Sequence, residues 1–348
     1  MKVAVYDTQS FDREYLTRKD WEFDHALSFF EAKLTPETAA LAIGHPCISC
    51  SVGDQLDAKT LPLLAGLGVK LIALRSAGYN HVDLNETDRL GLRVVRVPAY
   101  SPNAVAEHAT ALLLALDRHI PKAYNRVRDL DFSLQGLMGF DLFGKTVGLI
   151  GTGKIGSVMA KIMNGFGCRV LAFDPKPDAI LAAAKQVTYV PLTELYMKSD
   201  IISLHVPLTP ETHHIIAADA LGLMKNGVYI INTGRGALID TRALISGLKT
   251  GHIGAAGLDV YEEEEGVFYQ DLSDHVLKDD ILARLLTFPN VLVTSHQAFF
   301  TREAVTNIAR TTLQNITDFA NGLPLKNEVR AETHLIPPTP VLRGRVAV

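Results

Sequence analysis

The chain has 348 residues, a length that suits two domains better than one. Hydrophobic residues make up 47% of it, charged residues make up 21%, and the formal net charge is −4. This composition supports a large core, excludes a mainly disordered chain, and disfavours nucleic acids and anionic membranes as partners. The first residues predict a strand rather than a signal peptide, and the most apolar helical stretch, 109–116, is too short to span a bilayer, so we expect a cytoplasmic protein.

The first hundred residues alternate short apolar runs with helical patterns, which is typical of parallel βα architecture. Ser101 and Pro102 then predict the start of a long helix, because serine caps helices and proline suits the first turn. Its pattern continues to residue 129, with Pro121 as a kink or break. The expected strands are 2–6, 47–51, 70–74 and 94–97, and the expected helices include 60–67 and 83–90.

The chain contains three cysteines, an odd number that does not suggest a disulfide framework. Cys47 and Cys50 have CxxC spacing, but redox chemistry requires the first cysteine at a helix start, and this pair lies in an apolar run. No second CxxC and no nearby histidine completes a zinc site. We therefore interpret both cysteines as core residues.

The most informative segment is 145–174, in which an apolar run ends in Gly151, Gly153 and Gly156 before a helical pattern. The first glycine permits a tight turn, the second lets the backbone approach a pyrophosphate, and the third lets the helix pack against the strand. A second apolar run ends at Asp174, where a carboxylate can bind the adenosine ribose and repel a 2′-phosphate. The segment predicts a dinucleotide site that prefers NAD to NADP.

A second set of apolar runs completes a doubly wound unit after this fingerprint. The final helical pattern, 302–319, has no strand after it and is expected to return to the first domain. The tail from Ala331 contains prolines and no periodicity, so we expect it to wrap the surface or to be disordered. The expected strands begin at Thr146 and continue with 169–173, 201–205, 228–232, 254–259 and 291–294.

Three polar segments follow strands of this second set, and ligands bind beyond the carboxyl ends of such strands. Arg235, between two glycines, can bind a carboxylate through two hydrogen bonds and polarise an adjacent keto oxygen. One member of the acidic run 262–265 can pair with a cation there, and at least two of its members are expected to be solvated. His296 supplies a side chain that titrates near neutral pH, as an acid/base for hydride transfer requires.

Together these motifs resemble the D-isomer-specific 2-hydroxyacid dehydrogenases, most closely the fermentative D-lactate dehydrogenases. The resemblance covers residues 1 to about 329. The segments that carry it are SAGYNHVD (76–83), VPAYSPNAVAEHA (97–109), GLIGTGKIG (148–156), HVPLT (205–209), INTGRGALID (231–240), GLDVYEEEEG (257–266) and TSHQAFFT (294–301).

The resemblance implies roles for individual residues. Arg235 binds the keto acid, and His296 donates or accepts the proton. The family's catalytic glutamate stands five residues after the motif aspartate, which gives Glu264, and this residue supports the protonated imidazole. The implied substrate contacts are Ser76, Ala77, Gly78, Tyr100, Arg235, His296 and Phe299. The implied cofactor contacts are Gly151, Gly153, Lys154, Ile155, Gly156, Asp174, Val206, Pro207, Thr233, Gly234, Arg235 and Asp259. Many relatives carry serine or alanine in place of Gly234, which should change little.

The resemblance also implies the architecture, in which a Rossmann NAD domain is inserted in a flavodoxin-like substrate domain with the active site in the cleft between them. We expect residues 1–100 to begin the substrate domain, 101–297 to bind NAD, and 298–348 to return to the substrate domain and form the tail. The implied reaction is reversible reduction of pyruvate to D-lactate by NADH in a homodimer or homotetramer. No metal is expected to take part in this reaction, because the chain lacks HExxH and Cys/His clusters. The alternatives are a bulkier 2-keto acid as substrate, or an NADH-sensing corepressor.

Overall fold

The computed structural model describes residues 1–264 and 266–331. The described residues divide into two compact units, one formed by Met1–Tyr100 with residues 302–331, the other by Ser101–Thr301. The chain therefore re-enters the first unit at Arg302, whereas the predicted boundary was residue 298. Residue 298 stays in the second unit because its backbone N–H donates to the carboxylate of Asp259 there (2.8 Å). The tail expected from Ala331 onward lies, past Ala331 itself, outside the described residues.

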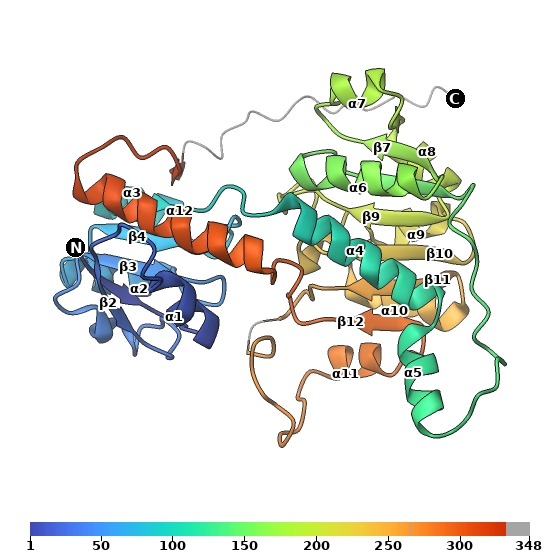
Figure 1. Cartoon of the computed structure of the whole chain (residues 1–348), viewed down its shortest axis with the longest axis horizontal. Helices are drawn as coiled ribbons and strands as arrows, with labels where there is room; N and C mark the ends of the chain where they lie inside the picture. Colours follow the sequence, from blue (N-terminus) through green and yellow to red (C-terminus); the bar gives the residue numbers. More distant parts are fainter. Residues whose placement is uncertain (265, 332–348) are drawn as a thin grey trace, which may run out of the picture. The chain divides into compact units, whose positions relative to one another are not determined.

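The first unit contains a sheet in the order β13-β5-β4-β3-β1-β2 (Figure 1). Strands β1 to β5 are parallel, and the order β2-β1-β3-β4-β5 is that of flavodoxin-like folds. Strand β2 was not predicted from the sequence, because this edge strand is only half-buried and lacks a continuous apolar run. The short β13, which pairs antiparallel with β5, was not predicted either. The bounds are β1 Lys2–Val5, β2 Ala26–Phe29, β3 Cys47–Cys50, β4 Leu71–Leu74, β5 Arg93–Val95 and β13 Glu328–Val329.

Helices cover both faces of this sheet. Leu61 and Leu64 of α2 and Leu84 of α3 form a core with one face, and Leu313 and Ile316 of α12 form a core with the other. The last helix thus returns to the first unit, and its apolar spacing explains why. The bounds are α1 Ser10–Leu16, η1 Ala39–Ala42, α2 Thr60–Gly66, α3 Leu84–Leu90 and α12 Arg302–Ala320.

Cys47 and Cys50 lie inside β3 and are buried free thiols, as the sequence predicted, and Cys168 in the second unit is buried as well. Burial raises the pKa of both thiols in β3, so neither is a reactive thiolate at neutral pH.

The second unit contains a parallel sheet in the order β12-β11-β10-β9-β6-β7-β8. The order reverses at β6, so the fingerprint turn stands at the switch point where α/β sheets bind ligands. The sequence analysis missed the two-residue edge strand β8, which is too short to form a pattern. The bounds are β6 Thr146–Ile150, β7 Arg169–Phe173, β8 Thr188–Tyr189, β9 Ile201–Leu204, β10 Val228–Asn232, β11 Ile253–Leu258 and β12 Val291–Val293.

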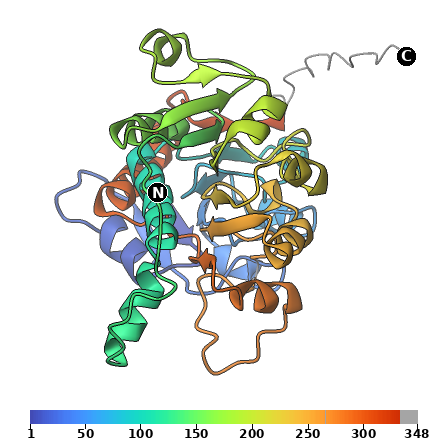
Figure 2. The same ribbon diagram turned by 90° about the vertical axis from the view of Figure 1, so that its right-hand side faces the viewer.

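Helices α4 and α6 cover one face of this sheet, and α8 to α11 cover the other (Figures 1 and 2). Ser101 caps α4 by accepting from Ala104 N (3.2 Å), and Pro102 stands in its first turn, as predicted. The break comes at His119, with φ of +50°, and Pro121 stands in the first turn of α5 beyond it. The bounds are α4 Pro102–Asp117, α5 Ile120–Arg128, α6 Lys154–Gly165, α7 Ala179–Ala183, α8 Leu192–Lys198, α9 Ala218–Leu223, η2 Gly236–Leu238, α10 Thr241–Thr250 and α11 Asp280–Leu286.

No helix in the described parts of the chain combines the length and the apolar character needed to cross a bilayer.

Candidate active site

The turn between β6 and α6 carries the three glycines of the fingerprint. Gly151 has φ of +95°, and a Cβ on it would lie 2.6 Å from the carbonyl oxygen of His205. A Cβ on Gly156 would overlap the carbonyl oxygen of Gly151. The protein's own packing therefore requires glycine at both positions, in agreement with the predicted tight turn and close contact of helix and strand.

Gly153 differs from these two glycines, because a Cβ on it would meet nothing within 4 Å. It is the N-cap of α6, whose first residues are Lys154 and Ile155, and no side chain caps this helix. Backbone N–H groups in the first turn thus lack a side-chain partner and stand at the positive end of the helix dipole. Open space and available donors at this turn fit a pyrophosphate.

Asp174 follows β7, and its carboxylate lies beside the fingerprint turn. One oxygen accepts from the backbone N–H and the hydroxyl of Thr152 (2.7 and 3.1 Å), and the other accepts from Lys176 N (2.8 Å). The Thr152 hydroxyl also contacts the Tyr189 hydroxyl at 2.8 Å. The half-buried carboxylate is therefore fixed at the end of β7, where the sequence predicted a ribose contact.

The loops after β9 and β10 carry the other predicted cofactor contacts of this unit, Val206 and Pro207 after β9, and Thr233 and Gly234 after β10. Thr233 is buried, and its hydroxyl has no hydrogen-bond partner among the described residues. Buried hydroxyls are normally paired, so this one fits a ligand atom as its partner.

His205 stands at the end of β9, and the sequence analysis gave it no role beyond its strand. Desolvation lowers the pKa of its imidazole to about 4, so the ring is neutral at physiological pH. Ser203 Oγ lies 3.0 Å from its Nε2. His205, whose backbone packs against Gly151, therefore adds no positive charge beside the fingerprint turn.

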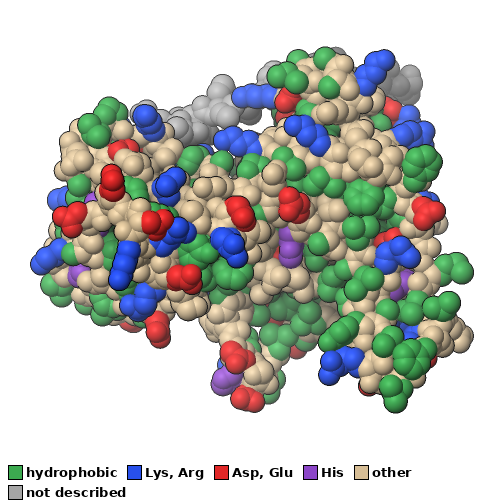
Figure 3. Space-filling model, viewed as in Figure 1, with side chains coloured by type: hydrophobic (Ala, Val, Ile, Leu, Met, Phe, Trp, Pro, Cys, Tyr) green, Lys and Arg blue, Asp and Glu red, His purple; other side chains and the backbone are tan. Residues whose placement is uncertain are grey.

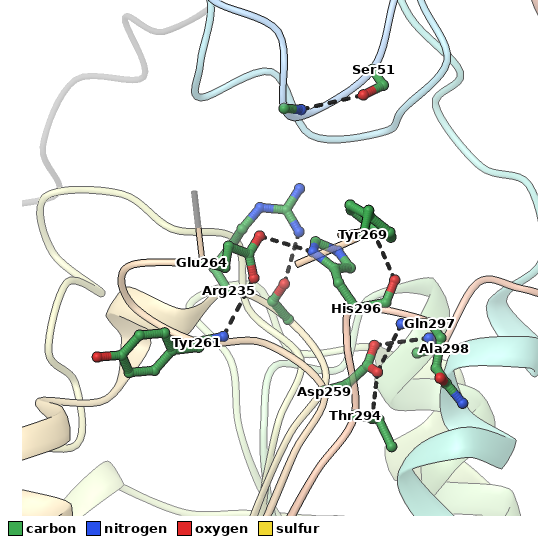
Figure 4. A network of polar contacts seen from close by, with 12 residues as sticks. Ser51, Arg235, Asp259, Tyr261, Glu264, Tyr269, Thr294, His296, Gln297 and Ala298 are labelled. Carbon is green, nitrogen blue, oxygen red and sulfur yellow. Dashed lines mark hydrogen bonds and ion pairs between the residues drawn. The ribbon is translucent and has the colours of Figure 1, made fainter. Parts of the chain in front are cut away.

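His296 follows β12, and its ring is joined to Glu264. Nδ1 lies 2.9 Å from Glu264 Oε1, and Glu264 Oε2 accepts from Tyr261 N (3.3 Å). Figure 4 shows the carboxylate directed at the imidazole. Because Nδ1 is taken by this contact, Nε2 is the ring nitrogen that can face a substrate.

The other described glutamates of the acidic run have different surroundings. Glu262 contacts His214 Nε2 at 2.5 Å and accepts from the Thr241 hydroxyl (2.9 Å). Glu263 is exposed to solvent. Glu264 therefore contacts the histidine assigned to acid/base chemistry, whereas Glu262 contacts a different histidine.

Asp259 lies beneath His296 and holds its loop. Its carboxylate is 0% exposed and accepts from the Thr294 hydroxyl, Gln297 N and Ala298 N (2.6, 2.8 and 2.8 Å; Figure 4). Its carbonyl oxygen accepts from His296 N at 2.7 Å. The sequence predicted that Asp259 contacts the cofactor, but its carboxylate is committed to this loop, and its backbone N–H donates to the Asn232 carbonyl (2.9 Å).

Arg235 follows β10 on a loop that is fixed at two points. Asn232 Nδ2 donates to the Arg235 carbonyl (2.8 Å), and a Cβ on Gly236 would overlap the backbone of Tyr261. This packing places the loop of Arg235 against the segment that carries Glu264. The guanidinium is half-buried, donates from Nη1 to the Gly234 carbonyl (2.7 Å), and lies on the same side of the loops as His296 (Figure 4).

The remaining predicted substrate contacts lie in other segments. Ser76, Ala77 and Gly78 follow β4 of the first unit, where the Ser76 hydroxyl donates to the Gly78 carbonyl (2.7 Å) and Arg96 Nη1 donates to the Ala77 carbonyl (2.7 Å). These contacts fix the loop backbone. Tyr100 ends the first unit, and its carbonyl accepts from Asn307 Nδ2 (2.7 Å). Phe299 belongs to the second unit, and its ring centroid lies 5.9 Å from that of Phe300.

Two side chains around His296 were given no role from the sequence. The Tyr269 hydroxyl donates to the His296 carbonyl (2.9 Å), and its ring stacks near the imidazole. His108 of α4 lies 3.1 Å from the Thr294 hydroxyl and 3.4 Å from Asp259. Both come from segments distant in sequence from His296, so their contacts with its loop depend on the fold.

The chain was compared with known proteins. The family model for the D-isomer-specific 2-hydroxyacid dehydrogenase NAD-binding domain matches residues 110–298. The chain is 50% identical over 329 residues to the D-lactate dehydrogenase of Escherichia coli strain K12, an alignment that covers 94% of this chain and 100% of that protein.

Solved structures are similar over the same length. The pyruvate reductase of Chlamydomonas reinhardtii has 44% identity and a TM-score of 0.87, with 94% of this chain and 98% of that chain covered. A D-lactate dehydrogenase of Aquifex aeolicus, complexed with NAD and lactic acid, has 34% identity and a TM-score of 0.81, with 92% and 96% covered.

Proposed function

Because the chain belongs to the D-isomer-specific 2-hydroxyacid dehydrogenases and is an NAD-dependent enzyme of that family, we propose that it reduces pyruvate reversibly to D-lactate. The observation that carries the proposal is the contact of His296 Nδ1 with Glu264, beside Arg235. This arrangement combines a supported acid/base with a cation for a carboxylate, and reduction of a 2-keto acid requires both.

Each of the three side chains has a separate task. When bound, NADH supplies the hydride that adds to the keto carbon. Arg235 binds the carboxylate of pyruvate and stabilises the negative charge that develops on the keto oxygen. His296 donates a proton from Nε2 to that oxygen and accepts it in the reverse direction. Glu264 orients the ring through Nδ1 and stabilises its protonated form.

The proposed cofactor site is the fingerprint turn with the loops after β7, β9 and β10. The open space at Gly153, the uncapped start of α6 and the unpaired hydroxyl of Thr233 support this assignment. Asp174 is held beside the turn and would repel a 2′-phosphate. We therefore expect NADH to be used in preference to NADPH.

We further propose that the first unit binds substrate. The backbone of Ser76, Ala77 and Gly78 follows the carboxyl end of β4, where parallel sheets present ligand sites. In this proposal these backbone groups bind the substrate carboxylate, and Tyr100 and Phe299 contact the substrate.

The test is a panel of kcat/KM values for pyruvate, phenylpyruvate and a branched-chain 2-keto acid, each with NADH and with NADPH. The proposal expects the highest value with pyruvate and NADH, and D-lactate as the product. If kcat/KM is higher for a bulkier keto acid, that acid and not pyruvate is the preferred substrate. Absence of turnover with every keto acid would overturn an enzymatic role. Equal use of both cofactors would contradict the assignment of Asp174.

We also propose that the enzyme is a homo-oligomer formed through an apolar arm, which we define as α5 and the segment to Met138. Figures 1 and 2 show α5 extending past the end of α4, and Figure 3 shows hydrophobic side chains gathered over this region. Leu134 is 83% exposed and Met138 is 91% exposed. A group of exposed apolar side chains on one segment supports an interface with another chain. The arm also exposes Ile120, Tyr124, Val127, Leu130 and Phe132.

Finally, we propose that the enzyme acts in the cytoplasm. All three cysteines are free thiols, which suits a reducing compartment, and the proposed reaction consumes NADH. Cell fractionation with a cytoplasmic marker enzyme tests this placement, and recovery outside the marker's fraction would contradict it.

A further inference from the structure

The side chains of His213, His214 and Glu262 form a cluster outside the residues assigned to catalysis. His213 and His214 lie in the loop after β9, and Glu262 lies in the loop after β11. One donor atom from each can be chosen so that all lie within 4.8 Å of one another. The two imidazoles stack with their centroids 3.9 Å apart, and His214 Nε2 lies 2.5 Å from Glu262 Oε1. We propose that this cluster binds a divalent transition-metal ion, with Zn²⁺ as the best match.

The donor set supports this choice of ion. Two imidazoles and one carboxylate, with a further position for water, are ligands that Zn²⁺ accepts in proteins. Ligand atoms about 2.0–2.2 Å from a tetrahedral ion lie about 3.3–3.6 Å from one another, so moderate side-chain rotations convert the present arrangement into a metal site. His213 is exposed and can make the largest rotation, while the ion takes the place of the direct contact between His214 and Glu262.

The groups behind the ligands hold them in position. Thr241 donates to the second oxygen of Glu262 from its hydroxyl and its backbone N–H (2.9 and 3.3 Å). The backbone N–H of His214 donates to the Ala237 carbonyl (2.9 Å). In the same loop the Thr212 hydroxyl donates to the Pro207 carbonyl (2.6 Å). Contacts of this kind orient metal ligands and reduce the cost of binding.

The loops that carry the ligands are also packed together. A Cβ on Gly236 would overlap the backbone at Tyr261 and Glu262, so the loop after β10 locks the position of Glu262. The loop after β9 is joined to the same loop through the contact of His214 with Ala237. The cluster is therefore formed by the fold itself, and one imidazole remains accessible to an ion from solvent.

The experiment is equilibrium dialysis of the full chain against ZnCl₂ in a non-chelating buffer, together with absorption spectra after addition of Co²⁺. The proposal expects one Zn²⁺ per chain from this cluster and visible Co²⁺ bands of a low-coordinate site. His213→Ala should weaken this binding at least about tenfold, and Glu262→Gln should weaken it as well. His275→Ala is the matched control, since His275 is an exposed histidine elsewhere in the same unit.

His213→Ala is the main variant because this side chain is exposed, so its loss should leave the fold intact. A thermal melt without metal checks that the variant is folded. Wild-type protein that binds no Zn²⁺ at micromolar concentrations overturns the proposal. Folded His213→Ala and Glu262→Gln variants that bind Zn²⁺ as tightly as wild type overturn it too, because other groups would then hold the ion.

Discussion

His296 occupies a strained backbone conformation, with φ of +53°. A non-glycine residue in this region costs on the order of 1 kcal/mol and persists only where surrounding contacts hold it. Here the buried Asp259 accepts from the N–H groups of Gln297 and Ala298, and its own carbonyl accepts from His296 N. These contacts hold the strained backbone of the residue whose imidazole contacts Glu264.

The first prediction at this scale concerns the substrate carboxylate. In Arg235→Lys one ammonium replaces a planar group with two parallel donors, so the two-point contact is lost. We expect kcat/KM for pyruvate to fall roughly 10- to 100-fold, the effect of about 1.5–3 kcal/mol for one charged hydrogen bond. The dissociation constant of NADH should change little. Arg242→Lys, on the exposed surface of α10, is the control, and an unchanged kcat/KM in Arg235→Lys would exclude the proposed role.

The second prediction concerns the partner of His296. Pyruvate reduction requires His296 to donate a proton, and Glu264 Oε1 lies 2.9 Å from its Nδ1. Glu264→Gln keeps the size of the side chain and replaces a charge-assisted contact by a neutral one. We expect kcat/KM for pyruvate to fall about tenfold, the effect of about 1.5 kcal/mol, while the dissociation constant of NADH changes little.

The matched control is Glu263→Gln, because Glu263 is the exposed neighbour in the same loop. Its kcat/KM for pyruvate should equal that of wild type. An unchanged kcat/KM in Glu264→Gln would show that the charge of Glu264 does not support His296 in the reaction.

At the scale of elements, the turn between β6 and α6 contains one glycine that the protein's own packing requires and one that it does not. A Cβ on Gly156 overlaps the Gly151 carbonyl, whereas a Cβ on Gly153 meets nothing within 4 Å. Gly156→Ala should therefore destabilise the protein by about 1–3 kcal/mol, the range for overpacking. Gly153→Ala should lower stability by less than about 1 kcal/mol, since alanine is a poorer N-cap than glycine.

The same pair of variants tests the cofactor site. Because the space at Gly153 is assigned to the pyrophosphate, Gly153→Ala should weaken NADH binding about tenfold, or about 1.4 kcal/mol. Thermal melts measure stability, and titration of NADH fluorescence measures binding. Normal NADH affinity in Gly153→Ala would show that this space is not used by the cofactor.

At the scale of the whole molecule, the apolar arm determines the predicted assembly. Leu130 and Phe132 are 77% and 70% exposed, so aspartate at either position disturbs few contacts within the chain. Leu130→Asp combined with Phe132→Asp should convert the oligomer into monomers, because charges are costly to bury in an apolar interface. Light scattering after size-exclusion chromatography measures the mass.

Ile180→Asp is the control for this experiment, since Ile180 is 79% exposed on α7, outside the arm. It should leave the mass unchanged. A monomeric wild-type protein, or a double variant with the wild-type mass, would contradict an interface formed by the arm.

The sequence by itself determined the elements whose signals are local. Continuous apolar runs indicated the buried strands, because strands covered on both faces exclude water along their whole length. Gly151 and Gly156 indicated a turn, because that backbone and its packing tolerate no side chain. The edge strands β2 and β8 were not predicted, because a half-exposed strand or a two-residue strand produces no continuous apolar run.

Only the tertiary structure decided which side chains meet. His108 and Tyr269 lie near His296 because helix α4 and the loop after β11 pack there, and the sequence gave neither side chain a role. The cluster of His213, His214 and Glu262 likewise joins two loops far apart in the chain. Local sequence sets the backbone states that each residue can adopt, whereas contacts between distant segments depend on the packing of the whole sheet and its helices.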